Sequence, residues 1–263
     1  MDLFLAPRAG IWCRSVAGWD AFRAAITADA EPPQRLPEPF PELLPAREGR
    51  RAPLHVRLAL EAGLQACRTN GVDPAQVMTV FASAMGDAQI TEYMCRTLAG
   101  PEPALSPTRF HNSVHNAASG YWSIGAGNRH PGTSVAAQQF TFPIAVLEAA
   151  ALATAERRGV LLIVHDVAAP APLDAICANR QPFAAGIILD ATPGGADWMP
   201  VRIERRPPGP PNAALGIAWL SALAEENYSA GGLPLLVAMA GTGSWPVILP
   251  AGFSDCLAIS RRD

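Results

Sequence analysis

The sequence predicts a layered α/β fold, and three observations support this prediction. Two continuous apolar runs, residues 77–84 (VMTVFASA) and 159–167 (GVLLIVHDV), are typical of strands buried on both faces of a parallel sheet. Residues 139–158, directly before the second run, are Ala-rich and strongly helical in pattern. The chain has 263 residues, of which 49% are hydrophobic and only 16% charged, so it is long and apolar enough to bury a large core.

The first third of the chain alternates regular elements with a proline-rich segment. Residues 3–12 are a candidate strand, and Trp19–Ala28 has the pattern of a short helix. Six prolines in residues 31–45 exclude a helix interior or a central strand, so we expect an extended surface segment. Apolar residues then recur at helical spacing over residues 53–70, and Gly71 supplies a stop.

The middle third supplies a strand-helix-strand unit. Residues 87–98 and 113–125 are predicted helices, and small residues in the second allow neighbouring elements to approach closely. Residues 133–138 are strand-like and lead into the Ala-rich helix and the buried strand that follows it. This order indicates a βαβ unit, and several such units imply a layered α/β fold.

In the last third of the chain, predicted strands outnumber predicted helices. Residues 183–191 and 201–206 are predicted strands, and a helix is expected from about residue 212 to residue 226. Residues 233–240 and Cys256–Arg261 are candidate final strands.

The chain contains no lysine, because all 20 of its basic residues are arginines. This excludes Schiff-base chemistry, a pyridoxal phosphate enzyme and a P-loop with its phosphate-binding lysine. The formal net charge of -3 argues against nucleic acid as a partner, since a basic face is the usual sign of nucleic-acid binding.

The cysteines and the lack of a long apolar stretch indicate the cellular environment. The five cysteines include no CxxC pair, which excludes a zinc ribbon and a thioredoxin-like redox pair. No apolar stretch reaches the ~18 residues of a membrane span, and the first residues do not resemble a signal peptide. We therefore expect a cytoplasmic protein with no membrane span, whose thiols are reduced and mostly buried.

Three short motifs are candidates for chemistry, each with a structural alternative. His111 and His115 are four residues apart and could place two metal ligands on one helix face. Because no cysteine or acidic residue nearby completes a site, packing is the favoured interpretation and we expect no metal. His165 and Asp166 end a buried strand and are either a general-base pair or a polar strand end capped by the following loop. Residues 241–244 (GTGS) could hold an anion, although such turns usually only reverse the chain. The absence of a GxSxG motif excludes the α/β-hydrolase elbow.

The most informative segment spans residues 106–149. It contains Asn116-Ala-Ala-Ser-Gly120, Ser123-Ile124, a His130-Pro131 turn, a short strand and the Ala-rich helix. This order resembles the N-terminal half of the β-ketoacyl synthases, the condensing enzymes of fatty-acid and polyketide synthesis. In that family an NxxAGxxSI-like helix leads through a Gly-Pro turn to a strand that ends at the nucleophilic cysteine. Further segments that resemble the family are residues 80–86 (VFASAMG) and 252–262 (GFSDCLAISRR).

The resemblance covers roughly residues 3–170 and implies a fold class and a domain organisation. The expected fold is a thiolase-like layered α/β fold of the α/β/α/β/α type with an abbreviated second half. Residues 1–182 would form the ketoacyl-synthase-like N-terminal half, and residues 183–263 a shortened C-terminal half that completes one domain.

The same alignment places Gln139 where the family has its nucleophilic cysteine. A glutamine cannot form a thioester, although its amide can donate and accept hydrogen bonds. The family's HGTGT and KxxxGH motifs also have no match, and the lysine of the second is absent from the chain. The chain is therefore similar to the chain length factors, the catalytically silent partners of polyketide ketosynthases, and in its length to the short forms found in aryl polyene pigment synthesis.

This resemblance implies a partner and a set of contact residues. We expect a heterodimer with a cysteine-containing β-ketoacyl synthase, to which acyl carrier protein comes through the complex, with no cofactor and no metal in this subunit. The strand before Gln139 would pair with the partner's equivalent strand, and bulk near the partner's acyl tunnel would limit chain length. The predicted strand and adjoining residues are Thr133, Ser134, Val135, Ala136, Ala137 and Gln138, and the predicted tunnel residues are Met85, Phe110, His111, Val114 and Asn116.

Two alternatives to a silent subunit stay open at the level of the sequence. Gln139 could polarise a malonyl thioester on acyl carrier protein and decarboxylate it to prime synthesis, because an amide can stabilise a developing enolate. The missing family histidines argue against this activity. A free-standing small-molecule carrier is also compatible with the fold, but no sequence feature favours it.

Overall fold

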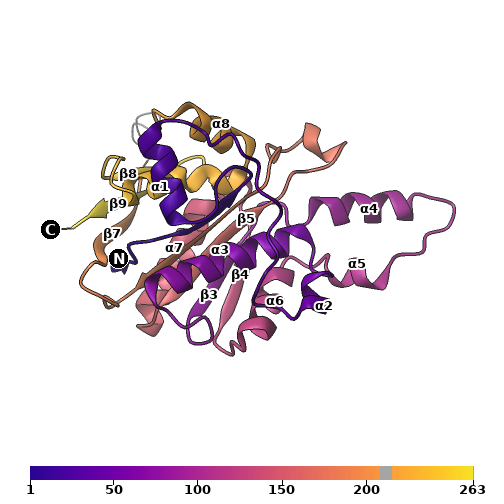
Figure 1. Ribbon diagram of the computed structural model, residues 1–263, viewed down its shortest axis with the longest axis horizontal. Helices are drawn as coiled ribbons and strands as arrows, with labels where there is room; N and C mark the ends of the chain where they lie inside the picture. Colours follow the sequence, from indigo (N-terminus) through magenta and orange to yellow (C-terminus); the bar gives the residue numbers. More distant parts are fainter. Residues whose placement is uncertain (208–214, 263) are drawn as a thin grey trace.

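The computed structural model describes residues 1–207 and 215–262 of the chain. Within these residues nine strands form one sheet, which crosses the whole body in Figure 1. The three strands β3, β4 and β5 are parallel, whereas every other pair of neighbouring strands is antiparallel. The strands follow the order β4 (Gly132–Val135), β3 (Met78–Ala82), β5 (Val160–Asp166), β6 (Phe183–Asp190), β1 (Asp2–Leu5), β7 (Met199–Arg206), β9 (Cys256–Arg261) and β8 (Val247–Pro250), and β2 (Gly10–Cys13) pairs separately with β6.

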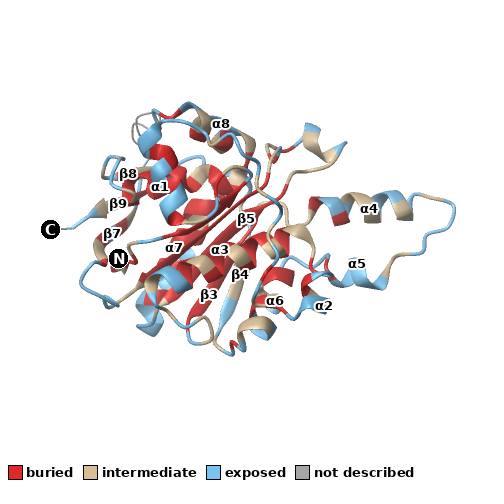
Figure 2. Cartoon of the chain, viewed as in Figure 1, coloured by how far each residue is buried: buried red, intermediate tan, exposed pale blue. Residues whose placement is uncertain are grey.

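Helices cover both faces of the parallel part of the sheet. In β5, Leu161 and Ile163 pack in one cluster with α3 (Leu54–Asn70) and α6 (Ala117–Ala126). The alternate residues of β5 pack in a second cluster with α7 (Thr141–Glu156) and α9 (Leu233–Met239). Figure 2 shows both layers as buried. This arrangement confirms the predicted α/β layering and explains why β3 and β5 are buried at every position.

Two glycines bring α3 into direct contact with the sheet. A Cβ atom at Gly10 in β2 would lie 1.9 Å from the carbonyl oxygen of Ala62, and one at Gly186 in β6 would lie 2.7 Å from the same oxygen. The helix backbone therefore rests on two neighbouring strands at one point. A side chain at either position would force the helix away from the sheet.

The C-terminal segment packs against α7 on the opposite face. It contains α8 (Ala218–Glu226), the 3₁₀ turn Tyr228–Gly232 and α9. The prediction of a strand over residues 233–240 is wrong, because this segment is the helix α9. Nearly all of α9 is buried, so the helix has no polar face, and its sequence does not show the period of 3.6 residues that identifies a helix. Only the proline in its first turn indicates a helix start.

Several other predicted elements differ in extent. Residues 3–12 form two short strands, β1 and β2, with different partners. The helix predicted over residues 113–125 begins only at Ala117, and the short helix α5 (Pro107–His111) precedes it. The strand predicted over residues 133–138 ends at Val135, and α7 begins at Thr141 after a 3₁₀ turn. The predicted start of a helix near residue 212 lies outside the described residues.

The remaining predictions agree with the structure. The helices α1 (Trp19–Ala28), α3 and α4 (Ala88–Leu98) are present, and most of residues 31–45 has no regular structure before the short helix α2 (Ala46–Gly49). Figure 1 shows α4 and α5 extending away from the body as an arm. No helix in the described part of the chain is long and apolar enough to cross a membrane. Strands β5 and β6 pair directly, so the division at residue 182 falls inside the sheet and stays a prediction.

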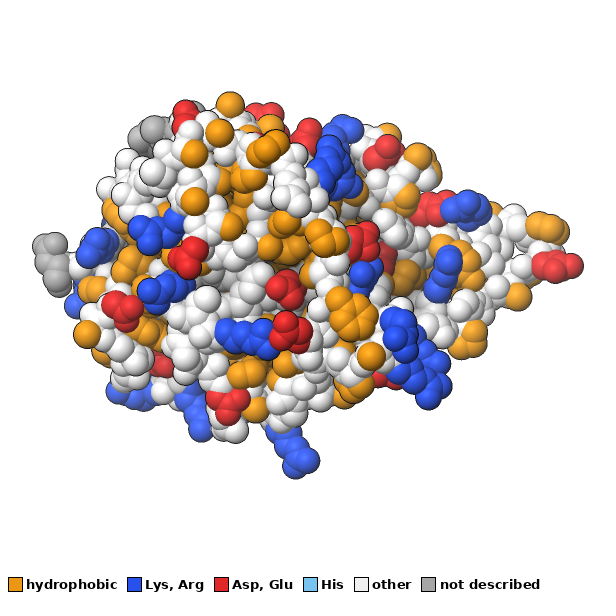
Figure 3. Space-filling model, in the orientation of Figure 1, with side chains coloured by type: hydrophobic (Ala, Val, Ile, Leu, Met, Phe, Trp, Pro, Cys, Tyr) orange, Lys and Arg blue, Asp and Glu red, His pale blue; other side chains and the backbone are white. Residues whose placement is uncertain are grey.

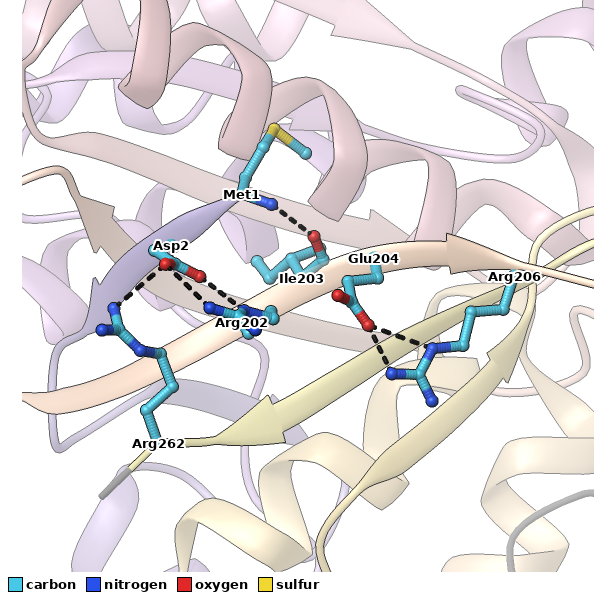
Figure 4. A network of polar contacts seen from close by, with 7 residues as sticks. All are labelled: Met1, Asp2, Arg202, Ile203, Glu204, Arg206 and Arg262. Carbon is cyan, nitrogen blue, oxygen red and sulfur yellow. Dashed lines mark hydrogen bonds and ion pairs between the residues drawn. The ribbon is translucent and has the colours of Figure 1, made fainter.

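Polar contacts join the start of the chain to β7, a strand that lies far from it in the sequence. The Met1 amino group donates to the Ile203 carbonyl at 2.8 Å, and the Asp2 carboxylate accepts from Arg202 at 2.8 Å (Figure 4). Arg262 adds a second ion pair to Asp2 at 3.4 Å. Because the charged groups are about half exposed, these ion pairs stabilise the fold only weakly and serve mainly to set the register of β1 on β7.

Candidate functional site

The carboxyl ends of the parallel strands β3, β4 and β5 meet at one edge of the sheet. The chain leaves β3 through Ser83, Ala84 and Met85, leaves β4 towards Gln139, and leaves β5 at Asp166. This is the edge at which open α/β sheets carry binding and catalytic groups. The candidate site is therefore described from this edge outward.

Asp166 is a fully buried carboxylate that joins two distant parts of the chain. Its Oδ1 accepts hydrogen bonds from Ser83 Oγ at 2.8 Å and from the Met85 backbone N–H at 3.3 Å, and its Oδ2 accepts from Ser229 Oγ at 2.6 Å. Burial raises the pKa of Asp166 above its usual range, although the hydrogen bonds from Ser229 and Ser83 oppose this shift. Its contacts make it the acceptor that fixes the loop bearing Met85.

His165 and Asp166 do not form the general-base pair that their adjacency allowed. Asp166 bonds to Ser229 on the α7 side of the sheet, whereas His165 stacks on His55 of α3 with ring centroids 5.8 Å apart. His165 is 2% exposed, and its Nδ1 atom has no hydrogen-bond partner within the described residues. The structure agrees with the alternative interpretation of a polar strand end covered by the following loops.

The His165 ring is surrounded by groups that keep it neutral. Burial is the main cause that lowers the pKa of His165 well below its usual value, and His55 and His115 lower it further. His55 in turn bonds through Nδ1 to Asp87 Oδ2 at 3.0 Å. Burial alone would raise the pKa of Asp87, but the hydrogen bond and charge of His55, together with hydrogen bonds from the Ile90 and Gln89 backbone N–H groups, outweigh burial and lower this pKa. Asp87 also caps α4, so this pair anchors the base of the arm to α3.

The neutral state of His165 predicts a pH dependence of stability. Below about pH 6.5 the unfolded chain binds a proton at this histidine whereas the folded chain does not, so stability falls as the pH decreases towards the lowered folded pKa. In urea unfolding, the slope for this group is expected to approach about 1.4 kcal/mol per pH unit, and a His165→Phe variant should lack it. The matched control His111→Asn, at an exposed histidine, should keep the slope. An unchanged slope in His165→Phe would contradict the prediction.

The two histidines of the sequence motif have different surroundings. His115 lies near the carboxyl edge, and its Nε2 is 3.0 Å from the Ser83 carbonyl oxygen. His111 instead lines an apolar groove at the surface. No group of three or more potential metal-binding side chains occurs among the described residues. Both histidines are exposed, with His115 next to the backbone of the loop after β3 and His111 facing the groove.

Gln139 lies in the 3₁₀ turn between β4 and α7. Both Gln138 and Gln139 are exposed, and no side-chain hydrogen bond of Gln139 occurs within the described part of the structure. Gln138 adopts φ 49°, which is uncommon for a residue other than glycine, and its carbonyl accepts from Thr141 Oγ1 at 2.7 Å. Thr141 is fully buried, so it holds this turn against α7.

Two aromatic side chains beside Gln139 were not predicted as site residues. Phe140 contacts Phe253 edge to face, with ring centroids 5.4 Å apart, and Phe253 is 95% exposed. Phe253 belongs to the loop between β8 and β9, so this contact brings the end of the chain to the start of α7. The only sequence signal for it was the resemblance of residues 252–262 to a family segment, which does not specify a contact.

Three of the predicted tunnel residues come together in one groove. The groove has a volume of about 270 Å³ between α2 and the helices α5 and α6. Apolar side chains at its rim are exposed, with Ile124 at 79% and Val114 at 52%. Phe110 lies next to it in α5, whereas Met85 lies on the loop after β3. The lining consists of His111, Val114, Asn116, Ala117, Gly120, Tyr121, Ile124 and Glu48.

The strand β4 forms one end of the sheet. It pairs with β3 through Thr133, Ser134 and Val135, and no described strand lies on its other side. Ala136, Ala137 and Gln138 follow the strand rather than belong to it. An edge strand with unpaired backbone groups can accept another strand, and proteins normally protect such edges.

The Gly-rich turn over residues 241–244 does not provide an anion site. The backbone N–H groups of Thr242 and Gly243 both donate to the Val237 carbonyl, and that of Gly241 donates to Ala238. These donors are used to end α9. A Cβ atom at Gly243 would lie 2.7 Å from the Ala238 nitrogen, so glycine is required here for close packing against the helix.

Comparison with known proteins gives a family model and several solved structures. Residues 19–208 match the model described as β-ketoacyl synthase, N-terminal domain. A search of curated protein sequences gives no match. Among solved structures, a chain of the ketosynthase ApeO in complex with its chain length factor ApeC from Xenorhabdus doucetiae is similar, with a TM-score of 0.73 and 20% identity, covering 99% of this chain and 100% of that one.

Two further structures agree over the same length. A chain of the ishigamide ketosynthase/chain length factor gives a TM-score of 0.70 at 13% identity, covering 99% of both chains. A chain of AntDE:AntF, a type II polyketide synthase acyl-carrier protein in complex with its ketosynthase bound to the hexaketide, gives 0.71 at 11% identity, also covering 99% of both. These similarities confirm the mixed α/β, thiolase-like ketosynthase fold, which is shortened here to 263 residues.

Proposed function

The chain belongs to the β-ketoacyl synthase N-terminal domain family, and we propose that it serves there as a catalytically silent subunit of the chain-length-factor type. The observation that carries this proposal is Gln139, which stands at the start of α7 where the family resemblance expects a nucleophilic cysteine. An amide cannot attack a thioester, so the acyl chain would be carried by a partner.

The cysteines elsewhere in the chain do not replace the missing nucleophile. Four of the five free cysteines are buried, and the exposed one, Cys95, lies on the outer part of α4. Burial raises the pKa of Cys67 to about 12 and also raises that of Cys13. A reactive cysteine needs a lowered pKa, because the thiolate is the nucleophile. The buried thiols of Cys13 and Cys67 are therefore poor nucleophiles, which supports the silent assignment.

The proposed partner is a β-ketoacyl synthase with an intact cysteine. Similar structures include complexes of a ketosynthase with its chain length factor, which supports a heterodimer. The unpaired edge of β4 would add the partner's equivalent strand and so extend the sheet across the interface. Acyl carrier protein would reach the complex through the partner's active site.

The groove residues would then act on the length of the product. Four of these residues lie on or beside α5 and α6, close in sequence to β4: Phe110, His111, Val114 and Asn116. Met85 lies at the carboxyl edge of the sheet. In the heterodimer these side chains would close the far end of the partner's acyl tunnel. A larger side chain there would stop elongation earlier, because the chain end would meet it sooner.

The proposal predicts a stable complex and a length-dependent product. Co-expressed with its ketosynthase, the chain should elute with it as a heterodimer in size-exclusion chromatography, and Val114→Trp should shorten the main product by at least one extension unit. Ile176→Trp, at another exposed apolar residue far from β4 in the sequence, is the control and should leave product length unchanged. A stable monomer that does not alter product length would refute the proposal.

The alternative activity, decarboxylation of malonyl carrier protein, is favoured by one observation. Gln139 is exposed and its amide makes no hydrogen bond within the described residues, so it is free to bond to a substrate. If the purified chain alone releases CO₂ from malonyl carrier protein, and Gln139→Ala abolishes this release, the enzyme assignment replaces the silent one.

A further inference from the structure

Three adjoining cavities form a groove beside the end of β2 and the loop between β5 and β6, away from the edge strand β4. Their volumes are about 360, 240 and 230 Å³, and Arg14 and Arg35 line all three. Arg180 lines the largest. We call this feature the arginine groove. It runs between the end of β2, the proline-rich segment, the loop between β5 and β6, and α8. Figure 3 shows arginine side chains between α8 and that loop.

The three guanidinium groups of the arginine groove have no ion-pair partner within 4.0 Å in the described part of the chain. Two carboxylates, Glu31 and Glu226, line the largest cavity as well, and Glu226 accepts a hydrogen bond from Gln181. A third carboxylate, Glu38, lines the smallest cavity and is ion-paired to Arg57 at 2.7 Å. In the largest cavity, three arginines therefore face two carboxylates, which leaves an excess of positive charge. Like charges held around one concave space repel one another, and a bound anion relieves that repulsion.

The arginines stand on segments that hydrogen bonds fix in place. The Leu36 N–H donates to the Arg14 carbonyl at 2.7 Å, which ties the proline-rich segment over the end of β2. The Arg180 N–H donates to the Glu226 carbonyl at 2.7 Å, which ties the loop between β5 and β6 to the end of α8. The groove is thus assembled from parts of the chain that are distant in sequence but mutually anchored.

Each end of the arginine groove includes apolar side chains among its polar lining. Trp219 and Leu223 line the cavity at one end, and Trp12 and Leu54 line the cavity at the other. A ligand in the groove would therefore place its charge against the arginines and an apolar part against one of these side chains. The largest cavity falls within the range of about 300–1,000 Å³ typical of small-molecule sites, which favours a small ligand over a protein face.

We propose that the arginine groove binds an organic phosphate, with the phosphate held by Arg14, Arg35 and Arg180. The planar guanidinium matches phosphate oxygens with two parallel hydrogen bonds, and three arginines together can bind the oxygens from different sides. The groove uses no residue of β4, α5 or α6, so this inference does not rest on the proposed subunit function.

Titration of the full-length chain with phenyl phosphate tests the proposal. We expect binding that is at least tenfold tighter than that of inorganic phosphate, because the ring adds apolar contact at one end. The triple variant Arg14→Gln/Arg35→Gln/Arg180→Gln should weaken phenyl phosphate binding at least tenfold. The matched control Arg8→Gln/Arg23→Gln/Arg129→Gln removes the same charge from exposed arginines elsewhere and should bind like the wild type.

Indole N–H signals in an NMR titration provide a readout of location. Trp219 or Trp12, at the two ends of the groove, should shift on addition of phenyl phosphate, whereas the core residue Trp122 should not. Equal binding by the two triple variants, or no binding at millimolar concentration, would overturn the proposal. Binding of polyglutamate without binding of phenyl phosphate would also overturn it and would assign the groove to an acidic protein instead.

Discussion

Replacing Ser134 with proline is expected to weaken the heterodimer at least tenfold while the subunit itself remains folded. The Thr79 N–H bonds to the Pro131 carbonyl and the Ser83 N–H to the Val135 carbonyl, so residues 131, 133 and 135 direct their backbone groups to β3. Backbone direction alternates along a strand, so the N–H of Ser134 faces the open edge. Proline removes this donor and places its ring in the pairing plane, a change that an edge strand tolerates internally.

The measurement is isothermal titration of the ketosynthase with each variant, with far-ultraviolet circular dichroism to confirm folding. Ser134→Ala is the matched control, because it keeps the backbone N–H and removes only a hydroxyl that has no hydrogen-bond partner within the described residues. A Ser134→Pro subunit that is folded and binds as tightly as Ser134→Ala would show that β4 is not the pairing strand.

Replacing Asp166 with alanine is expected to lower the free energy of unfolding by about 3–5 kcal/mol. The carboxylate accepts hydrogen bonds from two hydroxyl groups and from the N–H groups of Ala84 and Met85, all at a buried position. Its loss leaves several buried donors without an acceptor, and each such group costs about 1–3 kcal/mol, less where water enters or the chain relaxes. The loss should appear in equilibrium urea unfolding at neutral pH.

Two further variants make the Asp166 experiment specific. Asp166→Asn retains one carbonyl oxygen and should lose less stability than Asp166→Ala. Asp197→Ala, at an exposed aspartate, should change the free energy of unfolding by less than about 0.5 kcal/mol. Because burial raises the folded pKa of Asp166, the contribution of this group to the free energy of unfolding should decrease as the pH rises from its unfolded to its folded pKa. If Asp166→Ala matches Asp197→Ala, the carboxylate does not hold the two segments together.

The local pattern of the sequence was sufficient for elements with a clear period or a clear stop. The helix Trp19–Ala28 has an apolar face, and the helix Leu54–Asn70 ends at a left-handed Gly71, so both were predictable. The segment Leu233–Met239 is buried all round, and burial on every side removes the pattern that distinguishes a helix from a strand. The break between β1 and β2 also escaped prediction, because it depends on which neighbours each strand finds.

The candidate site was predictable only where a motif aligned with a known family. Resemblance placed Gln139 at the start of α7, but the left-handed backbone of Gln138 and the contact between Phe140 and Phe253 depend on the folded chain. Asp166 bonds to Ser83 and Ser229, which are 83 and 63 residues away in sequence. No local pattern encodes such a pair of contacts.

The position of β1 has a consequence for the order in which the chain can fold during synthesis. β1 leaves the ribosome well before its two neighbours, β6 and β7, which begin only at Phe183 and Met199. Until those residues emerge, both edges of this apolar strand remain unpaired, and pairing across so much chain is slow. The interval before β6 and β7 emerge is therefore the stage of synthesis at which β1 is most open to pairing with another chain.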